Sequence, residues 1–408
     1  MLAPSSGGLR LEAARGTAGF FRVAPDAGGR WWLVDAEDRA FFCRAVHGVR
    51  NGAPGADAGS AAPFAGANAA GADAATRLRR WGFNTAGAGG DGAGADDGLA
   101  FMANADFCRA GALIHAPGAR LPDVFAPDWP QLATARAAEV CLPLAGERRL
   151  LGWVTDDLPG WAQSTAAHPQ RPTLLQICLS LEPGFAAYHA AWEFTLALHG
   201  GKLASVARAW STPLANKEVV RELTRTEQGI TTRGYLRDHA RWTAEFARRY
   251  FTTTATAIRA ADAHHLVLGC RFGTPVGENV LGACLAPAVD VALLDWRELP
   301  HPGVAAAPVL AGDFCWADPA LYTPAAAGRA RGLTAVERML RRGRAAFART
   351  ARHPAVCGYV WRQWLDEPGE QPPFARGLVH GNGAEACEHT ELLADLNARV
   401  AALRRATP

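Results

Sequence analysis

Short apolar runs that end abruptly in polar residues recur along the sequence and predict the strands of a parallel sheet. A strand that is buried on both faces shows a continuous apolar run rather than an alternating one. The two clearest runs are Leu150–Thr155, which ends in Asp156 and Asp157, and Pro308–Gly312, which ends in Asp313. The same pattern predicts six further strands, at residues 41–49, 82–86, 106–114, 265–272, 289–296 and 356–364.

Helical segments separate these strands and complete the pattern of an α/β protein. Apolar positions at helical spacing predict helices at residues 74–81, 129–141, 334–351 and 388–404. Residues 19–42 flank a Gly-rich turn and predict an N-terminal β-hairpin, and residues 173–256 predict a helical excursion after strand four. Eight strands alternating with helices favour a (β/α)8 TIM barrel that uses residues 1–408 as a single domain. The Ala- and Gly-rich stretches 51–73 and 87–98 are expected to form loops over its mouth.

Composition limits the functional classes. The 408 residues are 49% hydrophobic and 20% charged, and the net charge of +3 is spread over both signs, which argues against a nucleic-acid or membrane partner. The nine cysteines include no C-x-x-C pair, so we expect buried free thiols rather than disulfides or a zinc site. Residues 1–22 contain no signal-peptide core, and no long apolar span follows them, so a cytoplasmic location is expected.

Carboxylates at the ends of the two clearest strands are the candidate catalytic groups. Barrel enzymes keep their reacting side chains at the C-terminal ends of the strands, and paired carboxylates beside aromatic rings suit hydrolysis of a glycosidic bond. We therefore expect Asp157 and Asp313 to form a catalytic pair, with the charge of Asp156 raising the pKa of one of the two adjacent aspartates. Side chains near strand ends are candidate substrate ligands: Asp156, His47, Asn84, His115, Arg271, Trp296, Trp316, Trp361, Arg362 and Trp364. No metal-ligand spacing accompanies them, and no cofactor is expected.

Several stretches, in order along the chain, resemble the β-agarase-like glycoside hydrolases of the large retaining clan of barrel enzymes. They are Gly29–Asp35, Trp81–Thr85, His265–Phe272 and Gly358–Trp361, and the similarity extends to Gly377–Val379. The resemblance implies a retaining hydrolase with two Glu, one ending strand four in Asp-Asn-Glu and one ending strand seven in Gly-Glu-Phe. The corresponding positions in this chain are Asp157, in Thr-Asp-Asp, and Asp313, in Gly-Asp-Phe.

Replacement of both Glu by Asp changes the expected mechanism. Retaining glycosidases hold their carboxyl groups about 5–5.5 Å apart, and inverting ones about 6.5–9.5 Å apart. Each shorter side chain withdraws its carboxylate by about 1 Å, so the gap could open to roughly 7 Å and admit a water molecule. We therefore expect a glycosidase that acts on an oligosaccharide or polysaccharide, with Asp157 as general acid and Asp313 as base or nucleophile. Inversion and retention both remain open.

Each assignment has a structural alternative. Asp157 can cap a following helix, Asp313 can be the buried ion-pair partner of Arg271 or Arg362, and the histidines and tryptophans can be core residues. The alternative functions are a carbohydrate-binding barrel without activity and a transglycosylase that acts on an unusual linkage. An arginine buried against either aspartate would favour the binding alternative, whereas two carboxylates facing an open cleft would favour the hydrolase. The sequence leaves the sugar, the linkage and the oligomeric state open.

Overall fold

Eight parallel strands form the central sheet of the protein. The computed structural model describes residues 11–50, 69–90, 98–162, 170–317 and 334–405. The strands run in the order β10–β9–β6–β5–β4–β13–β12–β11, and every neighbouring pair is parallel. They are β4 (Cys43–Val46), β5 (Thr85–Ala86), β6 (Ala100–Asn104), β9 (Leu150–Asp157), β10 (Leu266–Arg271), β11 (Ala292–Asp295), β12 (Val309–Phe314) and β13 (Val356–Trp361).

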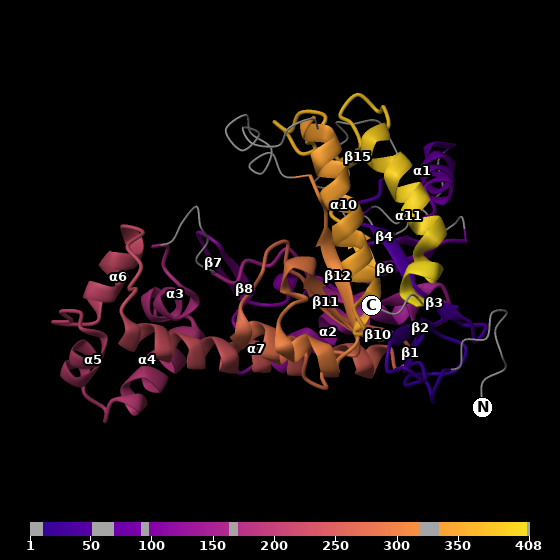
Figure 1. Ribbon diagram of the computed structural model, residues 1–408. Coiled ribbons are helices and arrows are strands. Elements are labelled where there is room, and N and C mark those ends of the chain that lie inside the picture. Colours follow the sequence, from indigo (N-terminus) through magenta and orange to yellow (C-terminus); the bar gives the residue numbers. More distant parts are fainter. Residues whose placement is uncertain (1–10, 51–68, 91–97, 163–169, 318–333, 406–408) are drawn as a thin grey trace.

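The two edges of this sheet meet. The amides of Asp290 and Val291, just before β11, donate to the carbonyl oxygen of Val267 in β10 at 2.9 and 3.3 Å. Parallel strands that close on themselves with helices outside form a TIM barrel, so the predicted (β/α)8 fold is confirmed (Figure 1).

Apolar side chains fill two regions, one inside the barrel and one between the barrel and its helices. In β9, Leu151 and Val154 belong to the inner cluster, whereas Leu150 and Trp153 belong to the outer one. The helices of the outer layer are α1 (Ala69–Arg80), α2 (Trp129–Cys141), α7 (Arg233–Ala261), α8 (Glu278–Cys284), α10 (Ala335–Arg352) and α11 (Cys387–Arg405). Burial on both faces explains why the barrel strands are continuous apolar runs.

An antiparallel sheet precedes the barrel and closes its N-terminal end. The expected hairpin is present as β1 (Arg22–Pro25) and β2 (Trp31–Val34), and β3 (Ala40–Phe41) adds a third strand. Phe21, Val23 and Leu33 join the inner apolar cluster beside Leu266, at the start of β10. The opposite end, where the barrel strands finish, is therefore the mouth.

The expected helical excursion is also present. It consists of α3 (Leu174–Ser180), α4 (Ala186–Leu198), α5 (Leu203–Trp210) and α6 (Glu218–Arg225), and it returns to the barrel through α7. Figure 1 shows α4, α5 and α6 at the end of α7 that is remote from the barrel. The buried carboxylate of Asp238 in α7 is 2.7 Å from both His199 Nε2 and Trp210 Nε1, and so ties the excursion to α7.

Strand three differs from its prediction. It is β6, at Ala100–Asn104, and not residues 106–114. Asp106 adopts a left-handed backbone with φ 54°, and a 3-10 segment, η1 (Phe107–Arg109), follows it. The later residues form β7 (Leu113–Ala116), which pairs with β8 (Ala119–Pro122) in a separate sheet. A left-handed residue interrupts an extended strand, and apolar content does not reveal it.

Other boundaries are shifted by a few residues. The predicted strand eight divides at Arg362 into β13 and β14 (Gln363–Leu365), and β14 pairs with β15 (Gly377–Val379). Helix α1 begins at Ala69, within the stretch expected to be a loop, while residues 51–68 and 91–97 of the two expected loops lie outside the described residues. Short 3-10 segments occur at η2 (Leu142–Leu144), η3 (Trp296–Glu298) and η4 (Pro302–Ala306).

The cysteines agree with the prediction of free thiols. All nine are unpaired, and seven of them are buried; Cys315 is partly exposed and Cys387 is exposed. Among the residues that the structure describes, no helix has the length and apolar character needed to cross a membrane.

Candidate functional site

Three charged side chains from the ends of β9, β10 and β12 meet at the mouth of the barrel. Arg271 and Asp157 are neighbours across the parallel pair of β10 and β9. Arg271 Nη1 lies 3.1 Å from Asp157 Oδ1, and Arg271 Nη2 lies 3.0 Å from Asp313 Oδ1. The two aspartates that the sequence singled out are therefore brought together, but through one guanidinium group. We call Asp157, Arg271 and Asp313 the acid–arginine triad.

Asp313 has a donor on each of its carboxylate oxygens. Its Oδ1 accepts from Nε and Nη2 of Arg271 at 3.2 and 3.0 Å, and its Oδ2 accepts from the amide of Gly273 at 3.2 Å. The side chain is only 2% exposed, and Arg362 Nη1 is 3.9 Å away. The backbone of Asp313 is left-handed, with φ 48°, a strained conformation for a residue other than glycine. The alternative in which Asp313 is a buried partner of Arg271 is what the structure shows.

Asp157 is the more accessible of the two acids. Its side chain is 23% exposed, and Arg271 is its ion-pair partner. Strand β9 runs through Asp157, and the next described helix, α3, begins at Leu174, so Asp157 is not a helix cap. The chain at Gly89 passes close by: a Cβ atom at that position would lie 2.5 Å from Asp157 Oδ2. Sequence reasoning missed this contact, because only the fold brings the loop after β5 to the end of β9.

The environment moves the pKa values of the two aspartates in opposite directions. Burial raises the pKa of Asp157, although the charge of Arg271 opposes the rise. Burial would also raise the pKa of Asp313, but the charges of Arg271, His47 and Arg362 outweigh it, and the pKa is lowered. Asp313 is therefore held as a carboxylate, while Asp157 is the group that takes a proton more readily.

His47 and Arg362 surround the triad. His47, which follows β4, is fully buried, and burial together with the charge of Arg271 lowers its pKa to about 3. Its Nδ1 is 3.3 Å from the carbonyl oxygen of Ala88, and its Nε2 has no partner among the described residues. Arg362 donates from Nη1 to the carbonyl oxygen of Gly273 at 3.2 Å, and its side chain is 21% exposed. Both residues lie at the mouth, as expected.

Asp156 faces away from the triad. Its buried carboxylate accepts hydrogen bonds from the Tyr250 hydroxyl in α7 and, at 2.8 Å, from the amide of Cys108. Burial raises the pKa of Asp156 to about 7, against the effect of these donors. The expectation that Asp156 binds substrate is therefore corrected: the side chain joins the barrel to α7. The rise in the pKa of Asp157 has burial as its largest cause and not, as expected, repulsion from Asp156.

Two other candidate ligands, Asn84 and His115, make no hydrogen bond or ion pair with the triad among the described residues. Asn84 lies before β5, and its side chain bonds the main chain of Arg44 and Phe42 at 2.8 and 3.0 Å. His115 is exposed on β7, outside the barrel. The expected role of Asn84 as a substrate ligand is corrected, because its side chain bridges β4 and β5. The role of His115 stays a prediction, although its place is on β7 and not on strand three.

The tryptophans are mostly core residues. Trp316, Trp361 and Trp364 are 5%, 0% and 5% exposed, and Trp361 packs against Trp316 with ring centroids 4.7 Å apart. Trp296, in η3, is only partly buried. Of these candidate sugar platforms, Trp296 is therefore the one that retains an exposed ring surface. Among the described residues, no group of three or more His, Cys, Asp or Glu side chains could hold a metal ion.

Comparison with known proteins finds similarity in structure but none in sequence. No protein-family model and no curated protein matches the chain. The structure is similar to that of an exo-β-agarase, with a TM-score of 0.67 and 17% sequence identity over 97% of this chain and 66% of that chain. It is similar to another agarase with a TM-score of 0.66 and 16% identity, over 96% of this chain and 66% of that chain. The chain thus has an agarase-like fold and spans slightly less than two thirds of the length of these agarases.

Proposed function

We propose that this chain is a carbohydrate-binding barrel of agarase-like fold, in which the acid–arginine triad occupies the place of a free catalytic carboxylate pair. The observation that carries the proposal is the enclosure of Asp313: its side chain is 2% exposed and its carboxylate is bound to Arg271. The similarity to an exo-β-agarase and to another agarase directs the choice of ligand toward agar-derived oligosaccharides.

Hydrolysis by two carboxylates requires a second group that can attack the sugar or activate a water molecule. Both oxygens of Asp313 already accept hydrogen bonds from nitrogen donors. The guanidinium group of Arg271 also stands between Asp313 and Asp157, where the anomeric carbon of a substrate would have to lie. One accessible acid, Asp157, is insufficient for this mechanism.

A polar cavity near the mouth supports the binding of a sugar. It has a volume of about 490 Å³ and is lined by residues of the segment that follows β13, among them Asp366, His380 and Asn382. Carboxylate, imidazole and amide groups can exchange hydrogen bonds with sugar hydroxyls. The volume lies within the range of about 300–1,000 Å³ that is usual for small-molecule sites.

Calorimetric titration with agar-derived oligosaccharides, combined with an assay for new reducing ends, tests the proposal. We expect measurable affinity without turnover, and the same affinity in Asp157→Asn and Asp313→Asn. Asn382→Ala should weaken binding, whereas Asn216→Ala, an exposed position on the excursion, is the matched control and should not. Absence of affinity for these sugars in the wild-type protein would contradict the proposal.

Glycoside hydrolysis is the second candidate, and the opposite pKa shifts of the two aspartates favour it. A raised pKa suits a general acid and a lowered one suits a base or nucleophile, so Asp157 and Asp313 would take these roles. Arg271 would then have to release Asp313 when substrate binds. Turnover that disappears in each Asn variant while the fold persists would establish this candidate, and NMR of the first-formed anomer would distinguish inversion from retention.

A further inference from the structure

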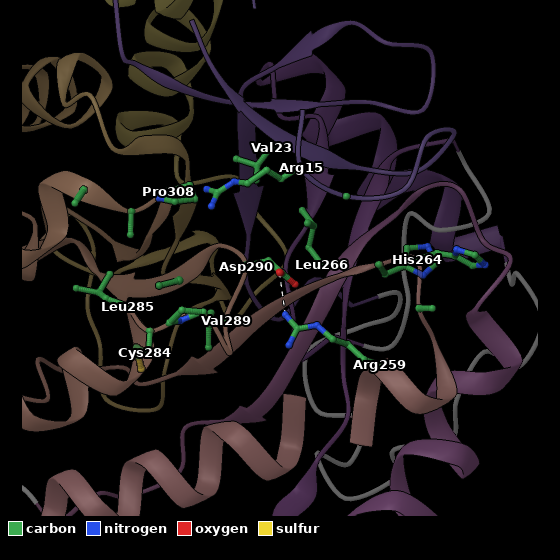
Figure 2. A pocket seen from close by; sticks show the side chains of 18 residues that line it. Arg15, Val23, Arg259, His264, Leu266, Cys284, Leu285, Val289, Asp290 and Pro308 are labelled. Carbon is green, nitrogen blue, oxygen red and sulfur yellow. Dashed lines mark hydrogen bonds and ion pairs between the residues drawn. The ribbon is translucent and has the colours of Figure 1, made fainter. Parts of the chain in front are cut away.

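A cavity of about 390 Å³ opens at the N-terminal end of the barrel, at the opposite end from the triad (Figure 2). Its apolar walls include Val23 of β1, Leu266 at the start of β10, Val289, and Pro308 just before β12. The hairpin sheet and the beginnings of the barrel strands therefore build it together. Its volume lies within the usual range for small-molecule sites.

One carboxylate in this cavity is already neutralised. Asp290 Oδ1 is 2.9 Å from Arg259 Nη2, and Asp290 Oδ2 accepts from the amide of Val267 at 2.8 Å. Both oxygens of Asp290 thus have partners, and the charge of Asp290 is balanced by that of Arg259. Figure 2 shows Arg15 and Arg259 on either side of Asp290.

Arg15 supplies the remaining positive charge. Its guanidinium carbon lies 4.5 Å from the centroid of the Trp31 ring, and Arg15 makes no ion pair with any described carboxylate. Stacking uses the face of the guanidinium plane and leaves the N–H groups at its edge available to an acceptor. Arg15 lines the cavity and Trp31 does not, so the ring supports the guanidinium group from outside the cavity. Arg15 is exposed, rests on the Trp31 ring and has no carboxylate partner among the described residues. An arginine of this kind beside apolar walls matches a ligand with an anionic head and an apolar body.

We propose that the N-terminal cavity binds a small organic carboxylate, with its carboxylate group on Arg15 and its apolar body between Val289 and Pro308. A planar guanidinium group can bind a carboxylate with two parallel hydrogen bonds. Arg15, Arg259 and Asp290 together give the cavity one net positive charge. This charge disfavours the binding of cations and adds nothing to the affinity for neutral molecules. This site is independent of the function proposed for the mouth.

Calorimetric titration with benzoate, benzyl alcohol and inorganic phosphate tests the two halves of the proposal. Benzoate should bind at least tenfold more tightly than benzyl alcohol, which lacks the charge, and than phosphate, which lacks the apolar body. Arg15→Gln should weaken benzoate binding at least tenfold, and Ala306→Phe, at an exposed position in the lining, should do the same by filling the cavity. Arg208→Gln, an exposed arginine on α5, is the matched control and should leave the affinity unchanged.

Four results would overturn the proposal. Equal affinity for benzoate and benzyl alcohol would remove the role of Arg15, as would an unchanged affinity in Arg15→Gln. Equal affinity for benzoate and phosphate would remove the role of the apolar walls. Benzoate binding that persists in Ala306→Phe with wild-type affinity would place the ligand elsewhere. Thermal unfolding of each variant without ligand confirms that the fold is retained.

Discussion

Removal of the Arg271 guanidinium group is the most direct test of the acid–arginine triad. This group donates to Asp157 and Asp313, and also to the carbonyl oxygen of Arg362 at 2.7 Å. Its side chain is 10% exposed and that of Asp313 is 2% exposed, so water replaces few of the lost contacts. Arg271→Met keeps the apolar stem of the side chain but removes the guanidinium group, so Asp313 retains only the Gly273 amide and, at 3.9 Å, Arg362.

The expected loss of stability follows from the burial of Asp313. Removing one partner of a buried ion pair costs about 3–5 kcal/mol, because the other charge remains desolvated and unpaired. We therefore expect Arg271→Met to lower the free energy of unfolding by about 3 kcal/mol or more at pH 7. The double variant Arg271→Met, Asp313→Asn should recover at least half of this loss, since no buried charge is then left unpaired at Asp313. Arg248→Met, which removes an exposed ion pair with Glu245, is the control and should cost less than about 1 kcal/mol.

Urea unfolding followed by circular dichroism measures these differences, and pH provides an independent check. In the wild-type protein the folded pKa of Asp313 is lowered, so its stabilising effect is present above the unfolded pKa of about 4 and is lost as pH falls through the folded value. In Arg271→Met, burial alone should raise that pKa, so Asp313 takes a proton earlier and the difference between the proteins should shrink toward pH 4. A cost below about 1 kcal/mol at pH 7, or no relief from the second substitution, would refute the reasoning.

Three further substitutions test other parts of the structure. The folded pKa of Asp156 is raised to about 7, so its contribution to stability is present below the unfolded pKa and is lost as pH rises to about 7. Asp156→Asn should remove this pH-dependent loss of stability, which is measured by comparing urea midpoints at pH 5 and pH 8. Gly89→Ala should cost about 1–3 kcal/mol, because φ is +84° and the new Cβ would lie 2.5 Å from Asp157 Oδ2; a loss below about 0.5 kcal/mol in urea unfolding would contradict the contact. Asp238→Ala should increase amide hydrogen exchange in α4 and α5 but not in the barrel strands, because Asp238 holds two ring nitrogens of the excursion at 2.7 Å. An equal increase in exchange throughout the protein would argue against this local role.

The sequence by itself determined the barrel and the strand ends that carry Asp157 and Asp313. Continuous apolar runs such as Leu150–Thr155 arise because a barrel strand is buried on both faces, and this cause leaves a direct trace in the order of residues. The long helical stretch after strand four was visible from a different trace, because apolar positions recur at helical spacing along residues 173–256. Strand three was misplaced because its five residues, Ala100–Asn104, form a short run and because the left-handed Asp106 has no signature in apolar content.

Only the tertiary structure decided which groups meet at the mouth. Arg271 is separated from Asp157 by 114 positions and from Asp313 by 42, so no spacing in the sequence pairs them. Nor does the sequence tell that Asp156 bonds Tyr250 while its neighbour, Asp157, joins the triad. A shift of one position in the pairing of two strands moves a side chain to the opposite face of the sheet. The pairing of β9 with β10 contains such register shifts, and the sequence does not reveal them. Partnership, burial and the resulting pKa values therefore depend on the packing of strands far apart in the chain.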